Sequence, residues 1–174
     1  PGDRVAVGVS GGKDSLLLLY ALSLYRKFEH KNFELRGIML DMGFEAFDAS
    51  SVMRWCEELN IPFDVIQTDI AKVVFDLRKE NNPCSLCAKM RRGALNDAAK
   101  RLGCNKVALG HHREDAIETL MMSLIFEGRL HTFHPNMFLL DADVTVIRPM
   151  VYVPEKHVIH VARRLNLPVV HNPC

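Results

Sequence analysis

The sequence has little excess charge and no long apolar run, and each absence restricts the classes of protein to which the chain can belong. There are 22 Lys and Arg against 21 Asp and Glu, a net charge of +1, so bulk charge gives no reason to expect a polyanionic partner. The leucine run 16–19 is far shorter than the roughly 20 residues that cross a membrane, and no leader-like segment opens the chain. We therefore expect a cytoplasmic protein with no membrane partner.

Disulfides are also not expected. Five cysteines are an odd number, which a closed set of disulfides cannot use, so reduced thiols are the better interpretation. The 174 residues, 48% of them hydrophobic, fit one domain with a sizeable core and exclude a disordered or collagen-like chain. Because the chain opens at Pro1 without a methionine and stops at Cys174, we expect residues 1–174 to be a single domain that is truncated at both ends.

Runs of β-branched residues alternate with helical patterns along the chain, which predicts an α/β fold. We expect a doubly wound, mainly parallel sheet of about five strands with helices on both faces. Ligands of such sheets bind beyond the carboxyl ends of the strands, where the strand order reverses. The expected strands are 4–9, 35–40, 63–67, 106–109, 144–148 and a short last one at 169–170, and the expected helices are 14–28, 46–59, 70–79, 85–102, 113–126 and 155–165.

The turn after the first strand, residues 10–15, has the sequence Ser-Gly-Gly-Lys-Asp-Ser and leads straight into a helix. Two glycines let the backbone turn with its N–H groups inward, and the helix start adds unpaired donors and partial positive charge. Together these features favour a phosphate ligand. The spacing fits neither a Walker A loop nor the G-x-G-x-x-G fingerprint. A plain turn capped by Asp14 or Ser15 is the simpler alternative, but it does not require this combination of residues.

A C-x-x-C pair, Cys84 and Cys87, stands at the start of the helix expected at 85–102. Donors at a helix start favour the thiolate, the form that binds a metal or acts as a nucleophile. A redox pair and half of a zinc site both stay open. The redox motif normally follows the first strand of its fold, and a zinc site needs two further ligands, for which Cys174 and the histidines are available.

Charge is distributed unevenly although its sum is small. Residues 89–101 hold five basic side chains and one aspartate, whereas residues 34–76 hold nine acidic and three basic ones. This asymmetry offers a patch for polyanions, although from charge alone a solvated helix face is the simpler interpretation.

Residues 110–115, Gly-His-His-Arg-Glu-Asp, end one expected strand and begin the next helix. Two consecutive histidines could bind a metal, cap the helix or lie on the surface. His112 and Asp115 are three residues apart, which permits shared coordination. Their place at the mouth of the sheet favours Asp115 as a residue that faces a nucleotide and its Mg²⁺.

The motifs SGGKDS, PCSLCAKMRRGAL, GHHREDAIETLMMSLIFEGRLHTF and VIRPMVYVPEK follow one another in this order. With them the chain resembles, over nearly its whole length, the tRNA 2-thiocytidine synthetases, the TtcA family of PP-loop ATP pyrophosphatases with an adenine nucleotide alpha hydrolase-like fold. The resemblance implies an enzyme that uses ATP to adenylate the C2 oxygen of a tRNA cytidine, at position 32, with AMP and pyrophosphate as products. Sulfur delivered through a [4Fe-4S] cluster then replaces the oxygen.

The resemblance also implies roles for individual residues. Asp14, Asp115 and Arg91 would be catalytic, the two aspartates by positioning Mg²⁺ and Arg91 by offsetting phosphate charge. Cys84, Cys87 and Cys174 would hold the cluster, which leaves Cys56 and Cys104 as ordinary core residues. ATP and pyrophosphate binding would fall to Ser10, Gly11, Gly12, Lys13, Asp14, Ser15, Leu40, Asp41, Met42, Gly110 and His111. Apart from the resemblance, the basic side chains of Lys89, Arg92 and Arg129 are candidates for tRNA contacts. In the loop after Gly128, Arg129, His131, Phe133 and His134 could stack on a flipped base, although a loop that lies over the sheet edge explains them as easily.

The partners that the resemblance implies are tRNA, a cysteine desulfurase or another persulfide donor, and a second copy of the chain in a homodimer. Three alternatives stay open. Related enzymes thiolate a uridine but carry additional zinc-ribbon cysteine pairs, and lysidine-forming relatives use free lysine and need no C-x-x-C. A nucleotide-binding module without chemistry is the third.

Overall fold

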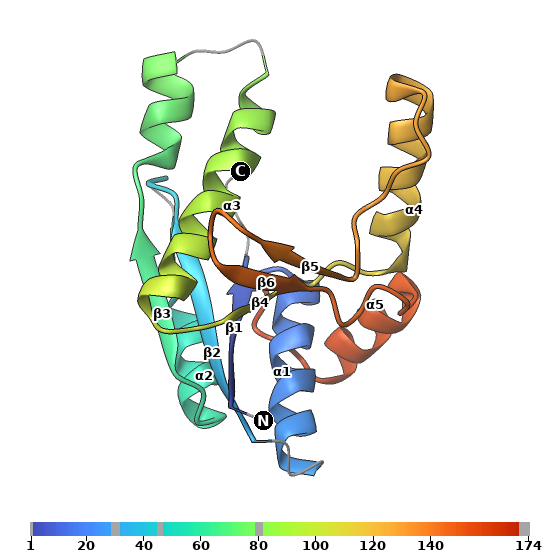
Figure 1. The fold of residues 1–174 in the computed structure, drawn as a ribbon. Helices are drawn as coiled ribbons and strands as arrows, with labels where there is room; N and C mark the ends of the chain where they lie inside the picture. The colour runs from blue at the N-terminus through green and yellow to red at the C-terminus, as the bar shows by residue number, and fades with distance from the viewer. Residues whose placement is uncertain (1, 29–31, 45–46, 79–81, 171–174) are drawn as a thin grey trace.

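The computed structural model describes residues 2–28, 32–44, 47–78 and 82–170, and its centre is a six-stranded sheet of order β3-β2-β1-β4-β6-β5 (Figure 1). Neighbouring strands pair in parallel except at the edge, where β5 runs antiparallel to β6. The strands are β1 (Asp3–Val9), β2 (Phe33–Asp41), β3 (Phe63–Gln67), β4 (Lys106–Ala108), β5 (Asn136–Leu139) and β6 (Val144–Ile147).

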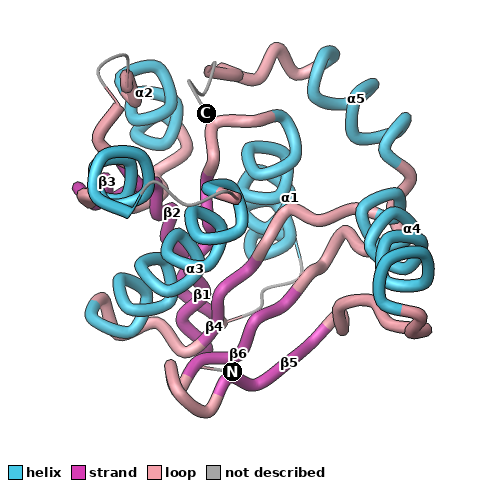
Figure 2. Tube along the Cα trace, turned by 90° about the horizontal axis from the view of Figure 1, so that it is seen from above, coloured by secondary structure: helices cyan, strands magenta, loops and turns pink. Residues whose placement is uncertain are grey.

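Helices cover both faces of the sheet, as the view from above shows (Figure 2). On one face lie α1 (Lys13–Phe28), α2 (Ser50–Glu58) and α5 (Glu155–Arg164). These helices share a core cluster with the side chains of β1 that point to this face. Four consecutive leucines of α1, residues 16–19, are all buried, because this helix packs between the sheet and its neighbouring helices. The doubly wound arrangement expected from the alternating pattern is thereby confirmed.

The opposite face is covered by α3 (Pro83–Arg101). This helix lies close to the central strand because β1 has a glycine under it: a Cβ at Gly8 would lie only 2.7 Å from Cδ2 of Leu95. Leu95, Ala98 and Ala99 form a second core cluster with Val107 of β4. A π-helical segment, η1 (Lys72–Arg78), precedes α3 and packs against it.

The strand order reverses between β1 and β4. From β1 the chain adds β2 and β3 on one side and then returns to add β4 and β6 on the other. The loops after β1 and β4 therefore flank the crevice in which ligands of open α/β sheets bind.

Beyond β4, α4 (Arg113–Met122) continues as a π-helical segment, η2 (Ser123–Glu127), and stands away from the sheet (Figure 1). Gly128 ends it with a left-handed φ of 64°. No α4 residue is buried. Within the described ranges, no helix combines the length and the apolar character that crossing a membrane requires.

Two predictions about the sheet are wrong. The pair Val169-Val170 is not a strand, because the amide of Val170 donates to the carbonyl of Gly11 (3.0 Å) and so braces the loop after β1. The sheet instead gains β5, which makes six strands rather than about five. Its residues are mostly exposed, so they lack the apolar alternation that identifies a half-buried strand.

The helix expected from residue 46 begins only at Ser50, after Asp48 accepts the Ser50 amide proton (2.8 Å).

Candidate functional site

The loop after β1 is closed by its two serines. The hydroxyl of Ser15 donates to the carbonyl of Gly12 (3.0 Å) and accepts from the amide of Ser10 (3.1 Å). Gly11 has a φ of +83°, and a Cβ on it would lie 2.4 Å from Cγ2 of Val170, so both conformation and space require glycine there. Because α1 begins at Lys13, the amides of its first turn have no acceptor within the helix and are available to an anion.

The loop after β4 lies directly against this turn. A Cβ on Gly110 would be 3.0 Å from both the carbonyl carbon of Asp14 and the amide nitrogen of Ser15, which are backbone atoms that cannot move aside. Only a glycine lets the two loops approach so closely. The structure therefore brings together two of the predicted nucleotide-binding segments, residues 10–15 and 110–111, at the reversal point of the sheet.

Charges at the start of α1 are paired with the start of α5. The Lys13 ammonium lies 3.1 Å from Oδ1 of Asp14 and 3.0 Å from Oε1 of Glu155. Burial alone would lower the pKa of Lys13, but hydrogen bonds to these two carboxylates outweigh it and the pKa is raised. Oδ1 of Asp14 is buried and accepts no well-aligned hydrogen bond from the described residues, and the Lys13 ammonium is the cation that lies closest to it there.

His112 lies buried between four carboxylates. Its Nδ1 is 3.5 Å from both Glu114 and Asp115, and its Nε2 is 3.9 Å from Asp14 and 3.7 Å from Glu155. The amide of His112 donates to Oδ2 of Asp115 (2.7 Å), which is the capping alternative considered from the sequence. In the part of the chain that the structure describes, no three His, Cys, Asp or Glu side chains converge as a complete metal centre.

Glu114 ties the start of α4 to the start of α5. Its Oε2 accepts the amide proton of Glu155 (2.7 Å), and this hydrogen bond, with help from Arg113, lowers the pKa of Glu114 to about 2. Sequence reasoning did not single out Glu155. It belongs to the last motif of the resemblance, and only the fold places it beside Lys13.

The cysteine pair sits at the amino end of α3, where Asn82 caps the helix by accepting from the Ser85 amide (3.4 Å). Cys84 is exposed, whereas Cys87 is buried beside Met42, Ile70 and Val74. Met42 follows β2, so the pair lies at the same edge of the sheet as the loops described above. Cys174, the third expected cluster ligand, lies outside the described residues.

The remaining thiols behave as core residues, as expected. Cys56 and Cys104 are both buried. Burial raises the pKa of Cys56 to about 11 and also raises the pKa of Cys104. None of the four cysteines within the described ranges forms a disulfide.

The other predicted contact residues are distributed along this edge. At the end of β2, the Asp41 carbonyl accepts from the amide and hydroxyl of Thr68 (2.8 and 2.9 Å), while Leu40 is partly buried. Lys89, Arg91 and Arg92 are exposed on α3, and the charge of Arg91 contributes to lowering the pKa of His111, after burial and Arg148.

Arg129 lies apart from these residues. It follows Gly128 beyond the end of η2, roughly 20 Å of helical rise from the start of α4.

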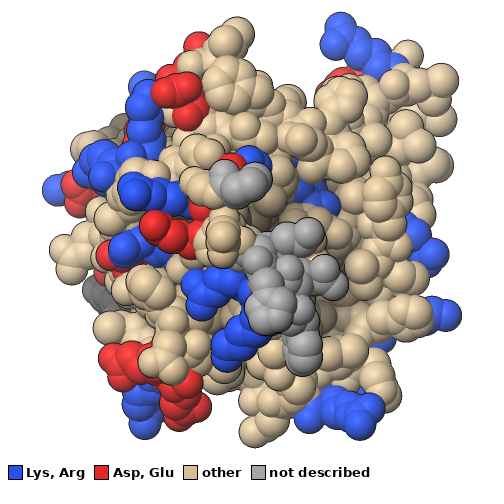
Figure 3. Space-filling model, turned by 60° about the horizontal axis from the view of Figure 1, so that its bottom comes forward, with Lys and Arg blue, Asp and Glu red and all other residues tan. Residues whose placement is uncertain are grey.

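On the face in Figure 3, lysines and arginines are interspersed with acidic side chains over one half, while the other half shows almost no acidic side chains.

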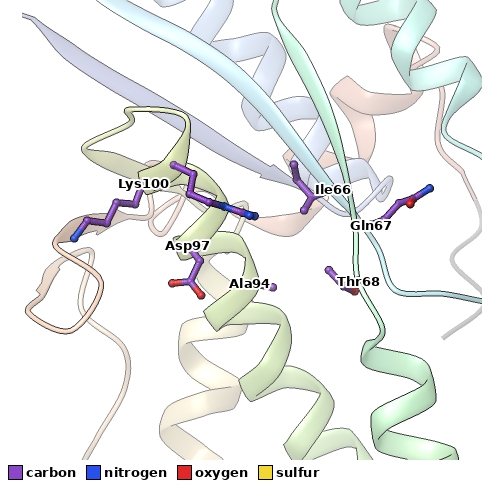
Figure 4. Close-up of a pocket in the computed structure, with 7 residues that line it drawn as sticks. Ile66, Gln67, Thr68, Ala94, Asp97 and Lys100 are labelled. Atoms are coloured by element: carbon purple, nitrogen blue, oxygen red, sulfur yellow. The ribbon is translucent and has the colours of Figure 1, made fainter.

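A shallow hollow of about 500 Å³ lies between the end of β3 and α3 (Figure 4). It contains none of the predicted ATP-binding or cluster residues, so it is separate from the crevice between β1 and β4. Its lining residues are Ile66, Gln67, Thr68, Ala94, Asp97, Lys100 and Arg101.

Comparison with known proteins agrees with this geometry. The model of the PP-loop domain family matches residues 1–173. A tRNA-cytidine(32) 2-sulfurtransferase of Citrifermentans bemidjiense is 41% identical over 174 residues, which cover 99% of this chain and 68% of that protein. The protein of the same name from Geobacter sulfurreducens is 39% identical with the same coverage.

Among solved structures, the U34-tRNA thiolase NcsA from Methanococcus maripaludis with its [4Fe-4S] cluster superposes with a TM-score of 0.80 at 32% identity. The match covers 99% of this chain and 59% of that protein, so this chain spans somewhat less than two thirds of the thiolase. A phosphoadenylyl-sulfate reductase from Candida auris shares the fold alone, with a TM-score of 0.61 at 14% identity. On these matches, the chain belongs to the PP-loop domain family and, within it, to the tRNA-cytidine 2-sulfurtransferases.

Proposed function

We propose that this chain carries out ATP-dependent thiolation of a tRNA cytidine, at position 32, by adenylating the C2 oxygen and replacing it with sulfur. AMP and pyrophosphate are the other products. The observation that carries the proposal is that the serine-closed loop after β1, the Gly110 turn and the cysteine pair all open on one edge of the sheet. The names of the family's relatives support the same reaction.

Phosphate binding falls to the loop 10–15. The amides at the start of α1 bind phosphate oxygens, and Lys13 and Arg91 offset the charge on the group that is transferred. Asp14 and Asp115 position Mg²⁺, which in nucleotide sites is commonly held by one or two carboxylates together with the phosphates. Oδ1 of Asp14 is buried and pairs with the Lys13 ammonium at 3.1 Å, without a well-aligned hydrogen bond from the described residues, so Mg²⁺ would compete with Lys13 for this oxygen.

The adenosine lies against the end of β2, at Leu40, Asp41 and Met42. Met42 shares a core cluster with Cys87, which supports an adenosine site next to the cysteine pair. Gly110 and His111 bound the other side of the nucleotide.

Cys84 and Cys87 would hold a [4Fe-4S] cluster together with Cys174, and their thiol donors at one helix start fit that group. When bound by three cysteines, the cluster supplies an iron without a protein ligand, at which sulfur can be carried. The cysteine pair, at the amino end of α3, would hold this group near the edge of the sheet at which we propose the nucleotide to bind.

The structural similarity to the U34-tRNA thiolase favours a second candidate, thiolation of a uridine at position 34. A [4Fe-4S] cluster on this fold would serve thiolation of either a cytidine or a uridine. The two functions differ in the product, 2-thiouridine instead of 2-thiocytidine.

A nucleoside experiment tests the proposal. The full-length protein is purified without oxygen, incubated with ATP, Mg²⁺, a sulfide source and unmodified tRNA, and the tRNA is digested for mass spectrometry. We expect 2-thiocytidine together with pyrophosphate release. Formation of 2-thiocytidine should be lost in Cys87→Ser, because sulfur transfer needs the cysteine pair, and retained in Cys104→Ala, a matched core cysteine. Formation of 2-thiouridine alone would assign the second function, and absence of pyrophosphate release would leave a nucleotide-binding module.

Partners and location belong to the same proposal. The substrate is tRNA, sulfur comes from a cysteine desulfurase or another persulfide donor, and the chain works as a single domain within a homodimer. A tRNA substrate and reduced thiols go with a cytoplasmic location.

A further inference from the structure

Arg148 is a buried cation without an acidic partner. It follows β6 directly, and its side chain is 9% exposed. Its Nη1 donates to the carbonyl of His134, its Nε donates to Nδ1 of His111 (3.2 Å), and its guanidinium lies 4.6 Å from the centre of the Phe133 ring. No ion pair in the described part of the chain includes Arg148.

The hydrogen bond from Nε of Arg148 to Nδ1 of His111 determines which ring nitrogen of His111 carries the proton. A guanidinium has only donors and keeps its protons in proteins, so Nδ1 of His111 must accept and must itself be unprotonated. The imidazole is therefore neutral, with its proton on Nε2. Burial, and after it the charge of Arg148, lowers the pKa of His111, which works in the same direction.

The ring is also held in place. It packs against Phe133, with 4.9 Å between ring centres, while Arg148 lies over the same phenylalanine. Arg148 contacts Nδ1, so Nε2 is the other ring nitrogen, and no hydrogen bond joins it to another of the described residues. His111 directly follows Gly110, whose backbone lies against Asp14 and Ser15 of the phosphate-binding turn, so the residue belongs to the loop that borders this turn.

We propose that Arg148 is a positioning residue that keeps His111 in the Nε2–H form, so that Nε2 donates a hydrogen bond to a substrate oxygen during adenylation. The proposal deepens the function proposed above and depends on it for the identity of the substrate. The oxygen belongs either to a phosphate of ATP or to the carbonyl of the base. A fixed neutral donor of this kind stabilises charge that develops on an oxygen without having to reorient.

Two substitutions separate the hydrogen bond from the charge. In Arg148→Gln the amide nitrogen stands the same number of bonds from Cα as Nε of arginine, so a donor to His111 remains. In Arg148→Met a methyl group occupies that position and no donor remains. Both lose the positive charge and the contact to His134, so a difference between them reports the donor. Arg163→Met, at an exposed position on α5, is the control.

The first readout is ¹⁵N NMR of the histidine side chains, with the His111 signals assigned by comparison with His111→Gln. We expect an unprotonated Nδ1 and a protonated Nε2 in the wild type, in Arg148→Gln and in Arg163→Met, and a population with the proton on Nδ1 in Arg148→Met. A wild-type His111 with its proton on Nδ1, or with both nitrogens protonated, would overturn the proposal whether or not the variants fold.

The second readout is activity in two parts. ATP affinity without tRNA, and pyrophosphate release at saturating ATP and tRNA, are measured for each variant. We expect a loss on the order of 100-fold in one of them for Arg148→Met and a clearly smaller loss for Arg148→Gln. Loss of ATP affinity shows that Nε2 already contacts a phosphate oxygen in the ATP complex, and loss of pyrophosphate release alone shows a contact that forms only with tRNA bound or during adenylation. Equal losses in the two variants would reject the role of the tautomer.

Failure of the proposed function has a different signature. If the wild type forms no 2-thiocytidine, but its His111 carries the proton on Nε2 and its ATP affinity falls in Arg148→Met more than in Arg148→Gln, the positioning role stands and the assigned reaction is wrong.

Discussion

Gly110 and Asp14 lie backbone against backbone at the mouth of the sheet, so close that a Cβ on Gly110 would be 3.0 Å from the carbonyl carbon of Asp14. This contact joins the loop after β4 to the loop after β1. A side chain at residue 110 would push the two loops apart, because the obstructing atoms belong to the backbone. The phosphate-binding turn is therefore shaped from both sides of the reversal point, and the contact itself can be tested.

We expect Gly110→Ala to lower the free energy of unfolding by about 1–3 kcal/mol, the usual cost of overpacking, and to weaken ATP binding. Urea denaturation and calorimetric titration with ATP measure the two effects. Gly93→Ala is the matched control, since Gly93 lies at an exposed position of α3 with no atom within 4 Å of where its Cβ would be. Alanine at this position should stabilise the helix by up to about 1 kcal/mol. Unchanged ATP affinity in Gly110→Ala would show that the loops tolerate separation.

Acid should loosen the junction between α4 and α5 through Glu114. Its pKa falls from 4.5 to about 2 because it accepts the Glu155 amide proton, so the folded state holds fewer protons than the unfolded state between these values. The stabilisation is therefore fully present above pH 4.5 and is lost as pH falls towards 2.

Glu114→Gln keeps an oxygen acceptor but cannot titrate. We expect its free energy of unfolding to depend less steeply on pH between 4.5 and 2 than that of the wild type, measured by urea denaturation at several pH values. Glu118→Gln, an exposed position on the same helix, should retain the wild-type slope. The same slope in all three proteins would exclude Glu114 as the source of the acid sensitivity.

The thiols should differ in reactivity as their surroundings do. In reduced, cluster-free protein at pH 8 we expect a small alkylating reagent to modify exposed Cys84 first, whereas Cys56, whose pKa is about 11, and buried Cys104 should react only after denaturation. Peptide mass spectrometry after timed labelling measures the order. Early labelling of Cys56 would mean that the core around α2 opens readily.

Local patterns in the sequence predicted the central fold because parallel strands and their helices carry their own periodicity. They failed at β5 and at Val169-Val170, where the outcome depends on a distant partner: β5 exists only because β6 pairs with it, and Val170 bonds to Gly11 instead of to a strand. Neither segment has a buried face, so neither carries the hydrophobic pattern from which a strand can be predicted or excluded.

The site follows the same rule. Residues 10–15 and 110–115 were predictable because their chemistry is contiguous in the chain. Glu155 and Arg148 were not singled out, because their partners Lys13 and His111 are far away in sequence and nothing in VIRPMVYVPEK alone says which side chain turns inward. Long-range charge pairing is a property of the fold, and only the structure gives it.

Substitutions of neighbouring basic side chains on α3 should separate tRNA binding from catalysis. If Lys89 and Arg92 contact phosphates of tRNA, replacing either with alanine removes one released counterion, so the slope of log affinity against log salt should become shallower by roughly 0.7–0.9. Pyrophosphate release at saturating tRNA should stay unchanged. Arg91→Ala, by contrast, should reduce release even at saturating tRNA, because Arg91 is assigned to the ATP phosphates.

Filter binding over a salt series measures the slopes. Arg4→Ala is the control, since Arg4 lies in β1 near the opposite end of the sheet and pairs with Glu34 (3.2 Å). Arg129→Ala tests whether tRNA reaches beyond the end of η2, roughly 20 Å along the helix from the start of α4. A wild-type slope in Lys89→Ala and Arg92→Ala, together with a shallower slope in Arg129→Ala, would place the tRNA along α4 instead of α3.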